Sequence, residues 1–366
     1  MRLIALVLLA LPMVLPAADP APADLSSLIA PLVVKHGVPA LGGAVIRSSG
    51  LQALGVAGLR RAGHPTELVT TGDRWHLGSC TKAMTGVLAA QLIEERTLKW
   101  DSRIVESFPK LPAQVDAGRI SLEQLLNHRA GLPANLTWQD YAGSDLRAER
   151  SRIVQAATAR PPLTAPGSAT LYSNLGYVIA GAMVEQAAGQ PWENALRSRI
   201  WIPLGIQNAG FGPANTVGKV DQPWGHDAQG NPVDHLDNPP VMGPAGTVNA
   251  SLADWGRFIQ VVLRGAQGEA VLMKPATWER LLTPGPLMDP QGGDRYANGW
   301  IFTERSWAGG RTLTHAGSNT VNFAVVWLAP AKDFAVLATC NSGQANAEAA
   351  CDEVASALIG WAGQHP

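Results

Sequence analysis

Strand-like segments lie at both ends of this chain, and helical segments lie between them. Residues 42–60, GGAVIRSSGLQALGVAGLR, form two short apolar runs around Ser48-Ser49-Gly50, a pattern that predicts a β-hairpin. Residues 100–235 are mostly helical patterns broken by proline and glycine. Toward its end the chain has three strand-like segments and a final helical one: 311–317, 322–330, 334–340 and 345–361. This order predicts an α/β fold in which a helical domain interrupts a sheet domain, with a ligand cleft between the two.

The first 18 residues, MRLIALVLLALPMVLPAA, place one arginine ahead of an apolar stretch that is followed by small residues. This pattern is typical of a cleaved secretory signal, and the stretch is too short to span a bilayer well. We expect cleavage between Ala17 and Ala23. No later segment has the length and hydropathy of a membrane span, so we expect an exported protein with no integral membrane span.

Charge and cysteine content narrow the function classes. The chain has 28 Lys and Arg against 29 Asp and Glu and no long basic run, so we expect no nucleic-acid partner. Three cysteines are an odd number and argue against a disulfide framework; Cys340 and Cys351 either pair or remain two buried thiols. Residues 225–240 gather histidines and aspartates, but their glycines and prolines favour a loop beside the cleft over a metal site. We therefore expect no metal and no cofactor.

Ser79 and Lys82 lie at the start of an apolar segment, SCTKAMTGVLAAQLIEER, whose Met84, Leu88 and Leu92 recur every four residues as on one face of a helix. Positions i and i+3 of a helix share a face, which would bring the hydroxyl and the amine within hydrogen-bonding reach. Burial and the positive helix terminus both lower the proton affinity of a lysine there. A neutral amine can accept the proton of a serine, so this pair is a candidate nucleophile and base.

A serine followed three residues later by lysine is weak as an isolated pattern. Ser107 and Lys110 match it too, but Pro109 forbids a helix interior there, so their side chains would not share a face. The alternative for the first pair is a helix cap beside a surface lysine. Two later elements favour the catalytic interpretation. They are Tyr172-Ser173-Asn174, directly before an apolar helix, and His315-Ala316-Gly317, on an expected strand where a glycine would let a substrate lie against the backbone.

With these three elements in this order, the chain resembles the serine hydrolases of the class C beta-lactamase and D,D-peptidase superfamily, which includes penicillin-binding proteins. The family pattern is serine-x-x-lysine, tyrosine-x-asparagine and lysine- or histidine-x-glycine, and softer matches are SLEQLLNHRAGLP, GPAGTVNASLADWGRF and YANGW. The resemblance implies a beta-lactamase/transpeptidase-like fold, an antiparallel sheet flanked by helices with an inserted all-helical domain. We assign residues 24–99 and 236–366 to the sheet domain and residues 100–235 to the helical domain.

The resemblance also implies roles for the site residues. Ser79 would attack a carbonyl and form an acyl ester, while Lys82 and the Tyr172 hydroxyl relay protons; which of the two is the base stays open. Asn174 would hydrogen-bond Lys82 and a substrate amide. His315, Gly317 and Ser318 would also contact the substrate. The backbone N–H groups of Ser79 and Ser318 would bind the oxyanion.

The third element departs from true class C beta-lactamases, which carry lysine-threonine-glycine there. A histidine is largely neutral at pH 7 and Ala316 has no hydroxyl, so we expect weaker binding of a substrate carboxylate. The histidine form is similar to the esterase and D-aminopeptidase branches, which favours hydrolysis of small esters or amides over efficient antibiotic breakdown. The periplasm, or secretion, is the expected location. The rival hypothesis is an exported binding or regulatory protein that kept the cleft and lost turnover.

Three further residues near these motifs are assigned structural roles. Cys80 points about 100° around the helix from Ser79, so we expect inert packing. His128 lies near a helix end, where a positively charged ring would suit the helix dipole, and it needs no catalytic role. Tyr296 belongs to a second tyrosine-x-asparagine copy that is better explained as the entry to a strand.

Overall fold

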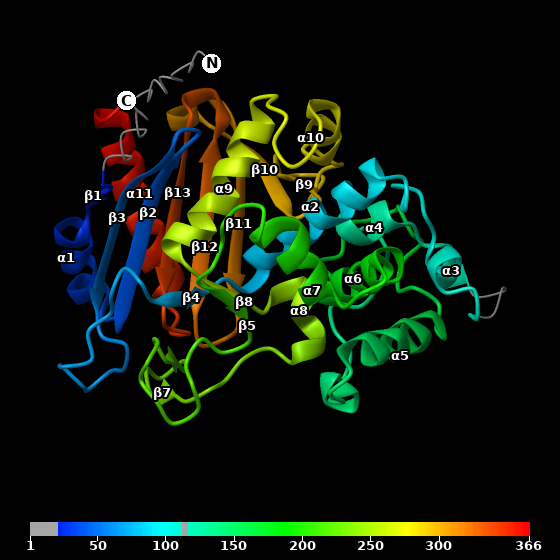
Figure 1. Ribbon diagram of the computed structural model, residues 1–366, viewed down its shortest axis with the longest axis horizontal. Helices are drawn as coiled ribbons and strands as arrows, with labels where there is room; N and C mark the ends of the chain where they lie inside the picture. The colour runs from blue at the N-terminus through cyan, green and yellow to red at the C-terminus, as the bar shows by residue number, and fades with distance from the viewer. Residues whose placement is uncertain (1–20, 112–115) are drawn as a thin grey trace, which may run out of the picture.

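The computed structural model describes residues 21–111 and 116–366, so the expected signal segment, residues 1–18, lies outside the described residues. Within these ranges the main sheet has eight strands, in the order β1-β3-β2-β13-β12-β11-β10-β9 (Figure 1). Their bounds are β1 Ala23–Asp24, β2 Ala40–Arg47, β3 Gly50–Gly58, β9 Arg295–Ala297, β10 Trp300–Arg305, β11 Gly310–Ser318, β12 Phe323–Ala329 and β13 Phe334–Cys340. Neighbouring strands are antiparallel except β1 and β3, which pair in parallel.

An early and a late strand of the chain pair in the middle of this sheet. Strand β2 pairs with β13, with Ile46 opposite Ala335 and Leu41 opposite Cys340. The expected hairpin is confirmed, since β2 and β3 pair around the turn at residues 48 and 49. The three late strand-like segments are also confirmed as β11, β12 and β13. The antiparallel sheet interrupted by helices is therefore present as predicted.

Helices cover both faces of the sheet, and their bounds among the described residues are α1 Ser26–His36, α2 Thr81–Glu94, α3 Ile104–Ser107, α4 Leu122–Leu126, α5 Leu146–Thr158, α6 Asn174–Ala188, α7 Trp192–Leu196, α8 Gly243–Gly246, α9 Leu252–Ala266, α10 Pro275–Leu281 and α11 Ala347–Gln364. Helices α1 and α11 pack on one face and α9 on the other (Figure 1). Both layers depend on glycines in β2. A Cβ atom on Gly43 would lie 2.8 Å from Leu358 of α11, and one on Gly42 would lie 2.9 Å from Leu252 of α9. A side chain at either position would force these leucines to move, so the two glycines allow the helices to pack closer to the sheet.

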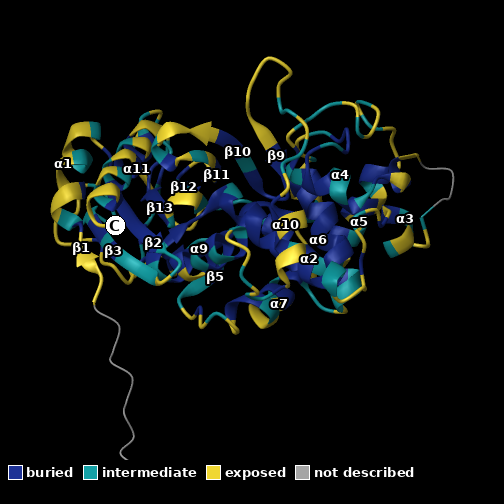
Figure 2. Ribbon diagram, turned by 90° about the horizontal axis from the view of Figure 1, so that it is seen from above, coloured by how far each residue is buried: buried dark blue, intermediate teal, exposed yellow. Residues whose placement is uncertain are grey.

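The helices between the two halves of the sheet form a separate group beside it, with α6 and the preceding α2 at its centre (Figure 1). Most residues of α2 and α6 are buried, as the dark blue ribbons of Figure 2 show. This explains why neither helix is strongly amphipathic in sequence: apolar surroundings on all sides leave no polar face. The predicted capping box is present at the start of α4, where the Ser121 hydroxyl accepts from Gln124 N and the Gln124 side chain accepts from Ser121 N.

A buried arginine joins three parts of the helical group. Arg150 of α5 lies 2.6 Å from a carboxylate oxygen of Glu185 in α6 and 2.5 Å from one of Glu193 in α7. Its guanidinium also donates to the carbonyl oxygens of Pro240 and Val241, in the segment that leads into α8. The guanidinium and its oxygen partners lie away from water, so their mutual contacts compensate the free-energy cost of removing each from water. The cluster therefore fixes α5, α6 and α7 around the segment before α8.

A small second sheet leads into the turn that carries Ser79. It has the order β4-β8-β5, with bounds β4 Arg74–His76, β8 Val248–Ser251 and β5 Ala209–Phe211. The short strands β6 Gly225–His226 and β7 Pro232–Val233 form a hairpin in the loop region before α8. None of the helices in the described part of the chain combines the length and the apolar character that crossing a membrane requires.

Candidate active site

Ser79 lies in a single helical turn, Gly78–Cys80, between β4 and α2. Gly78 has a φ of 49°, the left-handed conformation that glycine adopts without strain. Lys82 is the second residue of α2, and its Nζ lies 2.9 Å from Ser79 Oγ. The expectation that the i and i+3 positions bring the two side chains within hydrogen-bonding reach is confirmed.

Lys82 is completely buried, and polar groups surround its amine on three sides. Its Nζ lies 2.9 Å from Ser79 Oγ, 2.8 Å from Asn174 Oδ1 and 2.7 Å from the carbonyl oxygen of Ala245. No carboxylate is among these partners. Burial therefore dominates and lowers the pKa of Lys82 to about 7. In the neutral amine, two hydrogens can go to Asn174 and Ala245, which leaves the lone pair facing the Ser79 hydroxyl.

Tyr172 approaches the same hydroxyl from the segment before α6. Its phenol oxygen lies 2.8 Å from Ser79 Oγ and donates to it. The backbone holds this residue in place because the next residue, Ser173, caps α6 by accepting from Gly176 N. Burial raises the pKa of Tyr172 to about 12, against the hydrogen bond to Ser79, which lowers it. The residue is 41% exposed and solvent moderates the shift, but the phenol is protonated at neutral pH in either case.

Asn174 occupies the first position of α6 and bridges Lys82 to a loop of the helical group. Its Oδ1 accepts from Lys82 Nζ, as expected, and its Nδ2 donates to Asn135 Oδ1 at 3.0 Å. Asn135 was not recognised in the sequence, although it lies two residues after the SLEQLLNHRAGLP segment. The side-chain amide of Asn174 is thus oriented with its oxygen toward the lysine.

Two glycines bring β11 against the turn that carries Ser79. A Cβ atom on Gly317 would lie 2.1 Å from Leu77 O and 2.5 Å from Ser79 N, and one on Gly78 would lie 2.4 Å from Ser318 N. The interpretation that Gly317 makes room for the substrate is therefore wrong, because the backbone of residues 77–79 occupies that space. The close approach instead brings the backbone amides of Ser79 and Ser318 to neighbouring positions, which is the arrangement an oxyanion-binding pair requires.

His315 is buried and only 3% exposed. Its Nε2 lies 3.1 Å from the Tyr296 hydroxyl and its Nδ1 lies 2.6 Å from the Ala316 carbonyl oxygen, so both ring nitrogens have partners within the protein. Burial and the nearby Lys82 lower the pKa of His315 to about 3. The imidazole is therefore neutral, with the proton on Nδ1 and Tyr296 donating to Nε2. Tyr296 lies within the short strand β9, which leads into β10 and agrees with the predicted strand entry. Its hydroxyl group contacts His315, which the sequence alone did not indicate.

His128 differs from its sequence interpretation. Its ring is buried, and burial and the nearby Lys82 and His315 lower its pKa well below the usual value, so it carries no charge for a helix dipole. Its Nδ1 accepts from Ser173 N at 3.1 Å, and its ring centroid lies 4.3 Å from that of Tyr172 and 4.4 Å from that of Tyr296. His128 therefore supports the segment that brings the Tyr172 phenol to Ser79.

The three cysteines take no part in the hydrogen bonds of Ser79 Oγ and Lys82 Nζ. Cys80 is buried with its Sγ 3.3 Å from the His315 carbonyl oxygen, and burial raises its pKa, which confirms inert packing. Cys340 and Cys351 are both buried free thiols. Over the described ranges, no group of three His, Cys, Asp or Glu side chains is arranged to hold a metal ion. In the 225–240 loop, His226 instead contacts the carbonyl oxygen of Asn341.

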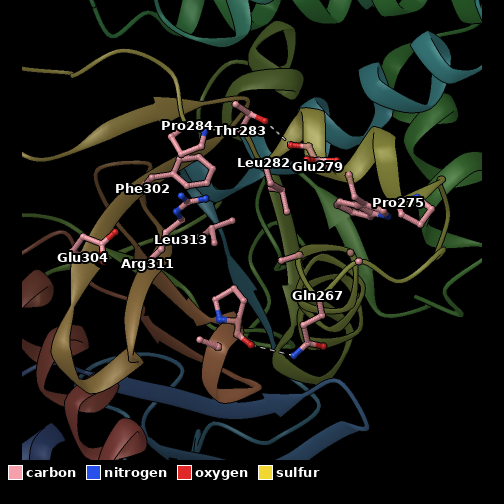
Figure 3. Close-up of a pocket in the computed structure, with 16 residues that line it drawn as sticks. Gln267, Pro275, Glu279, Leu282, Thr283, Pro284, Phe302, Glu304, Arg311 and Leu313 are labelled. Atoms are coloured by element: carbon pink, nitrogen blue, oxygen red, sulfur yellow. Dashed lines mark hydrogen bonds between the residues drawn. The ribbon is translucent and has the colours of Figure 1, made fainter.

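A cavity of about 810 Å³ lies elsewhere, between the α9–α10 region and the β10–β11 hairpin. Figure 3 shows Phe302 and Arg311 on one of its walls and Glu279 and Pro275 on the other. The residues that line it include neither Ser79 nor its partners. The chemistry described above is therefore independent of this cavity.

Comparisons with known proteins agree with the geometry. The family model described as Beta-lactamase matches residues 25–360. Penicillin-binding protein 4 of Amycolatopsis lactamdurans is 26% identical over 342 residues, which cover 86% of this chain and 84% of that protein. The unguisins hydrolase ungD' of Aspergillus campestris is 24% identical and matches 88% of this chain, but the match spans only 62% of its length.

Among solved structures, the octameric penicillin-binding protein homologue from Pyrococcus abyssi has the same fold, with a TM-score of 0.76 at 21% identity. The match covers 92% of this chain and 77% of that one. The family match extends over nearly all of the described chain and includes the Ser79 turn, the start of α6 and β11. This chain belongs to the beta-lactamase family and is a serine hydrolase of the beta-lactamase superfamily.

Proposed function

We propose that the protein hydrolyses small neutral esters or amides through an acyl ester on Ser79, with Lys82 as the general base. The observation that carries this proposal is the position of Ser79 Oγ, which lies between Lys82 Nζ at 2.9 Å and the Tyr172 hydroxyl at 2.8 Å. A serine that donates to a neutral amine and accepts from a phenol has its proton directed at a base and its lone pair free for attack.

Acylation begins when Ser79 Oγ attacks the substrate carbonyl carbon and its proton passes to Lys82 Nζ. The carbonyl oxygen becomes an oxyanion that accepts from the amides of Ser79 and Ser318. When the bond to the leaving group breaks, the Tyr172 hydroxyl donates its proton to the departing oxygen or nitrogen and is reprotonated from Lys82. The net result is an acyl ester on Ser79, a neutral leaving group and a neutral lysine.

Deacylation again uses Lys82 and the backbone amides of Ser79 and Ser318. A water molecule loses a proton to Lys82 as its oxygen attacks the ester carbonyl, and the oxyanion forms again at the two amides. Ser79 Oγ then leaves and regains a proton from Lys82. At the end of the cycle Ser79 is again a hydroxyl, Lys82 is neutral and the product is a carboxylic acid.

Lys82 is the better base of the two candidates for an energetic reason. With a pKa of about 7, a large fraction of Lys82 is neutral at neutral pH. The pKa of Tyr172 is raised to about 12, so a phenolate there would be rare. A base must be in its accepting form to act, and a pKa near the working pH is the most effective. Tyr172 therefore acts as a proton shuttle in its protonated form.

The preference for neutral substrates follows from the third motif. His315 is neutral and both of its ring nitrogens have internal partners, and Ala316 offers no hydroxyl. These residues therefore supply no cation or donor for a substrate carboxylate. We expect an acyl or leaving group without a carboxylate to bind better than the carboxylate-bearing counterpart of the same shape.

The direct test is covalent labelling of Ser79. A fluorophosphonate probe should add its mass to the peptide that contains Ser79, and Ser79→Ala should abolish both the label and the hydrolysis of a nitrophenyl ester. A panel of nitrophenyl esters, D-amino-acid anilides and a chromogenic cephalosporin ranks the substrates. Each should be tested against a carboxylate-bearing analogue. If the wild-type protein binds these compounds but turns over none of them faster than Ser79→Ala does, it is a binding or regulatory protein.

We also propose that the protein is exported to the periplasm or secreted. The support is the signal-like pattern of residues 1–18. Cell fractionation followed by N-terminal sequencing should find a mature chain that begins between residues 18 and 24. A cytosolic chain that retains its first residues would contradict this proposal.

A further inference from the structure

A buried histidine holds the residue that precedes the nucleophile. His76 is the last residue of β4 and is 5% exposed, and its Nδ1 accepts a hydrogen bond from Gly78 N at 3.1 Å. A nitrogen that accepts carries no proton, so the ring proton of His76 is on Nε2. This fixes the tautomer from the backbone alone.

The protonated side of the ring faces a buried aspartate. His76 Nε2 lies 2.7 Å from Asp237 Oδ1, and both side chains are 3% exposed. Two lone pairs would repel at this distance, so the contact requires the proton on Nε2, which agrees with the tautomer set by Gly78. The contact is close but lacks hydrogen-bond geometry, and among the described residues His76 Nε2 has no hydrogen-bond partner.

Asp237 also holds the residue that follows the second oxyanion amide. Asn319 Nδ2 donates to Asp237 Oδ1 at 2.9 Å, and Asn319 directly follows Ser318 in the chain. Asn319 is itself buried. The adjacent Asn238 donates from Nδ2 to the carbonyl oxygen of Gly246, one residue after the Ala245 carbonyl that accepts from Lys82. The loop at 237–238 is thus joined to three segments of the site.

We propose that His76 and Asp237 are positioning residues that hold the Ser79 and Ser318 amides in register with each other. The chain of contacts runs from Gly78 N through the His76 ring and the Asp237 carboxylate to the Asn319 side chain. It connects the residue before one amide donor to the residue after the other. This inference rests on the proposed acyl-serine mechanism and assigns a role to two residues, one of which lies in the loop that resembled a metal-binding segment in the sequence.

Because of these contacts, we expect substitution of His76 or Asp237 to reduce the catalytic rate more than it disturbs the structure. Oxyanion donors act only if they lie within a few tenths of an ångström of the developing charge, and a misplacement of about 1 Å costs on the order of 100-fold in rate. His76→Gln keeps a donor near Asp237 but removes the acceptor for Gly78 N. Asp237→Ala releases both His76 and Asn319, whereas Asp237→Asn keeps an acceptor oxygen at the same place.

His226 provides a matched control. It is also buried, its Nε2 accepts from Ala62 N at 3.0 Å and its Nδ1 lies 2.7 Å from Asn341 O, so it joins backbone segments in the same manner but does not contact the Ser79 turn. His226→Asn removes one backbone acceptor, as His76→Gln does. The two substitutions should therefore disturb the structure to a similar extent. A difference in their effect on activity would show that the place of His76 beside the Ser79 turn matters.

Two measurements test the proposal in the full-length protein. Amide hydrogen exchange should become faster at residues 77–82 and 316–320 in His76→Gln and Asp237→Ala, and not in His226→Asn. With a nitrophenyl ester, kcat and the rate of Ser79 phosphonylation should fall by about 10- to 100-fold in the same two variants, with KM within about threefold. Asp237→Asn should recover most of the loss.

Each of the other outcomes would overturn a specific part of this proposal. Amide hydrogen exchange at residues 77–82 and 316–320 could be as slow in His76→Gln and Asp237→Ala as in His226→Asn. That result would show that His76 and Asp237 do not hold these segments. Faster exchange with an unchanged kcat would show that this hold does not serve catalysis. If the wild-type protein is never labelled at Ser79, the proposed function fails, while the exchange measurement still decides whether the two residues hold the turn.

Discussion

Lys82 Nζ lies 2.9 Å from Ser79 Oγ, with no carboxylate among its hydrogen-bond partners. A buried ammonium normally requires a counterion, and a carbonyl, an amide oxygen and a hydroxyl compensate its desolvation only in part. This arrangement leaves much of the lysine neutral at neutral pH, since its pKa is lowered to about 7. If Lys82 is the base, as proposed, the catalytic rate depends on the protonation of this one group.

The pH dependence of kcat/KM should therefore rise with one apparent pKa near 7. Lys82 acts in its neutral form, so activity is low below its pKa of about 7, increases as pH rises through that value and then levels off. No descending limb is expected below the ionisation of Tyr172, whose pKa is raised to about 12. Initial rates with a nitrophenyl ester, corrected for spontaneous hydrolysis, measure this profile.

Lys82→Arg is the matching variant. A guanidinium stays charged at every accessible pH, so this variant should lose at least about 1,000-fold in kcat and should not regain it at high pH. A profile of the wild-type protein that falls from pH 6 to pH 8 would contradict the assignment of Lys82 as the base.

Gly317→Ala should inactivate the protein, because the new Cβ atom would lie 2.1 Å from Leu77 O and 2.5 Å from Ser79 N. Both atoms belong to backbone, so the strand and the turn must separate. We expect a loss of about 100-fold or more in kcat, as for a lost oxyanion donor. Gly363→Ala in α11, where a Cβ atom meets nothing within 4 Å, is the control and should leave activity unchanged. Near-wild-type turnover by Gly317→Ala would refute the close approach.

Much of the fold and the site could be predicted from the sequence because both depend on local patterns. The hairpin around Ser48-Ser49-Gly50, the three late strands and the Ser79–Lys82 pair each follow from the composition or spacing of neighbouring residues. The Tyr172 and Asn174 contacts were expected only through the family resemblance. That resemblance supplied the long-range proximity that local spacing does not contain.

The missed residues share a different property. Asn135, Tyr296 and Asp237 act through contacts with residues that are far away in the sequence. His76 accepts from the nearby Gly78 N, but its contact with Asp237 is also long-range. His128 was misjudged for the same reason. Its position near a helix end suggested a charged ring, but the desolvation that keeps the ring neutral comes from tertiary packing, which periodicity does not reveal.

Arg150→Met should destabilise the protein by about 3–5 kcal/mol, because it leaves two carboxylates near each other without their cation. Burial already raises the pKa of Glu185. Without the arginine this pKa rises further, so the penalty for the charged form is greatest above it and is relieved as pH falls through it. Urea unfolding should therefore show a larger loss at pH 8 than at pH 5.

Arg152 in the same helix is the control for this change. It is exposed and pairs with Glu149 at i,i+3, so Arg152→Met should alter the free energy of unfolding by less than about 1 kcal/mol at either pH. Equal effects of the two substitutions would show that the buried cluster does not stabilise the helical group.

His128 should affect catalysis through Tyr172 and not through its own titration. Its Nδ1 accepts from Ser173 N, and its ring packs 4.3 Å from the Tyr172 ring, so His128→Ala leaves a buried N–H unpaired and a space behind the phenol. We expect kcat to fall by about tenfold from the misplaced phenol. His128→Asn keeps an acceptor and suits the φ of 55° at this position, so it should recover part of the loss. Because burial keeps the ring neutral, the ascending pKa near 7 should be the same in all three proteins. A pKa that moves or disappears in His128→Asn would show instead that the imidazole itself takes part in proton transfer.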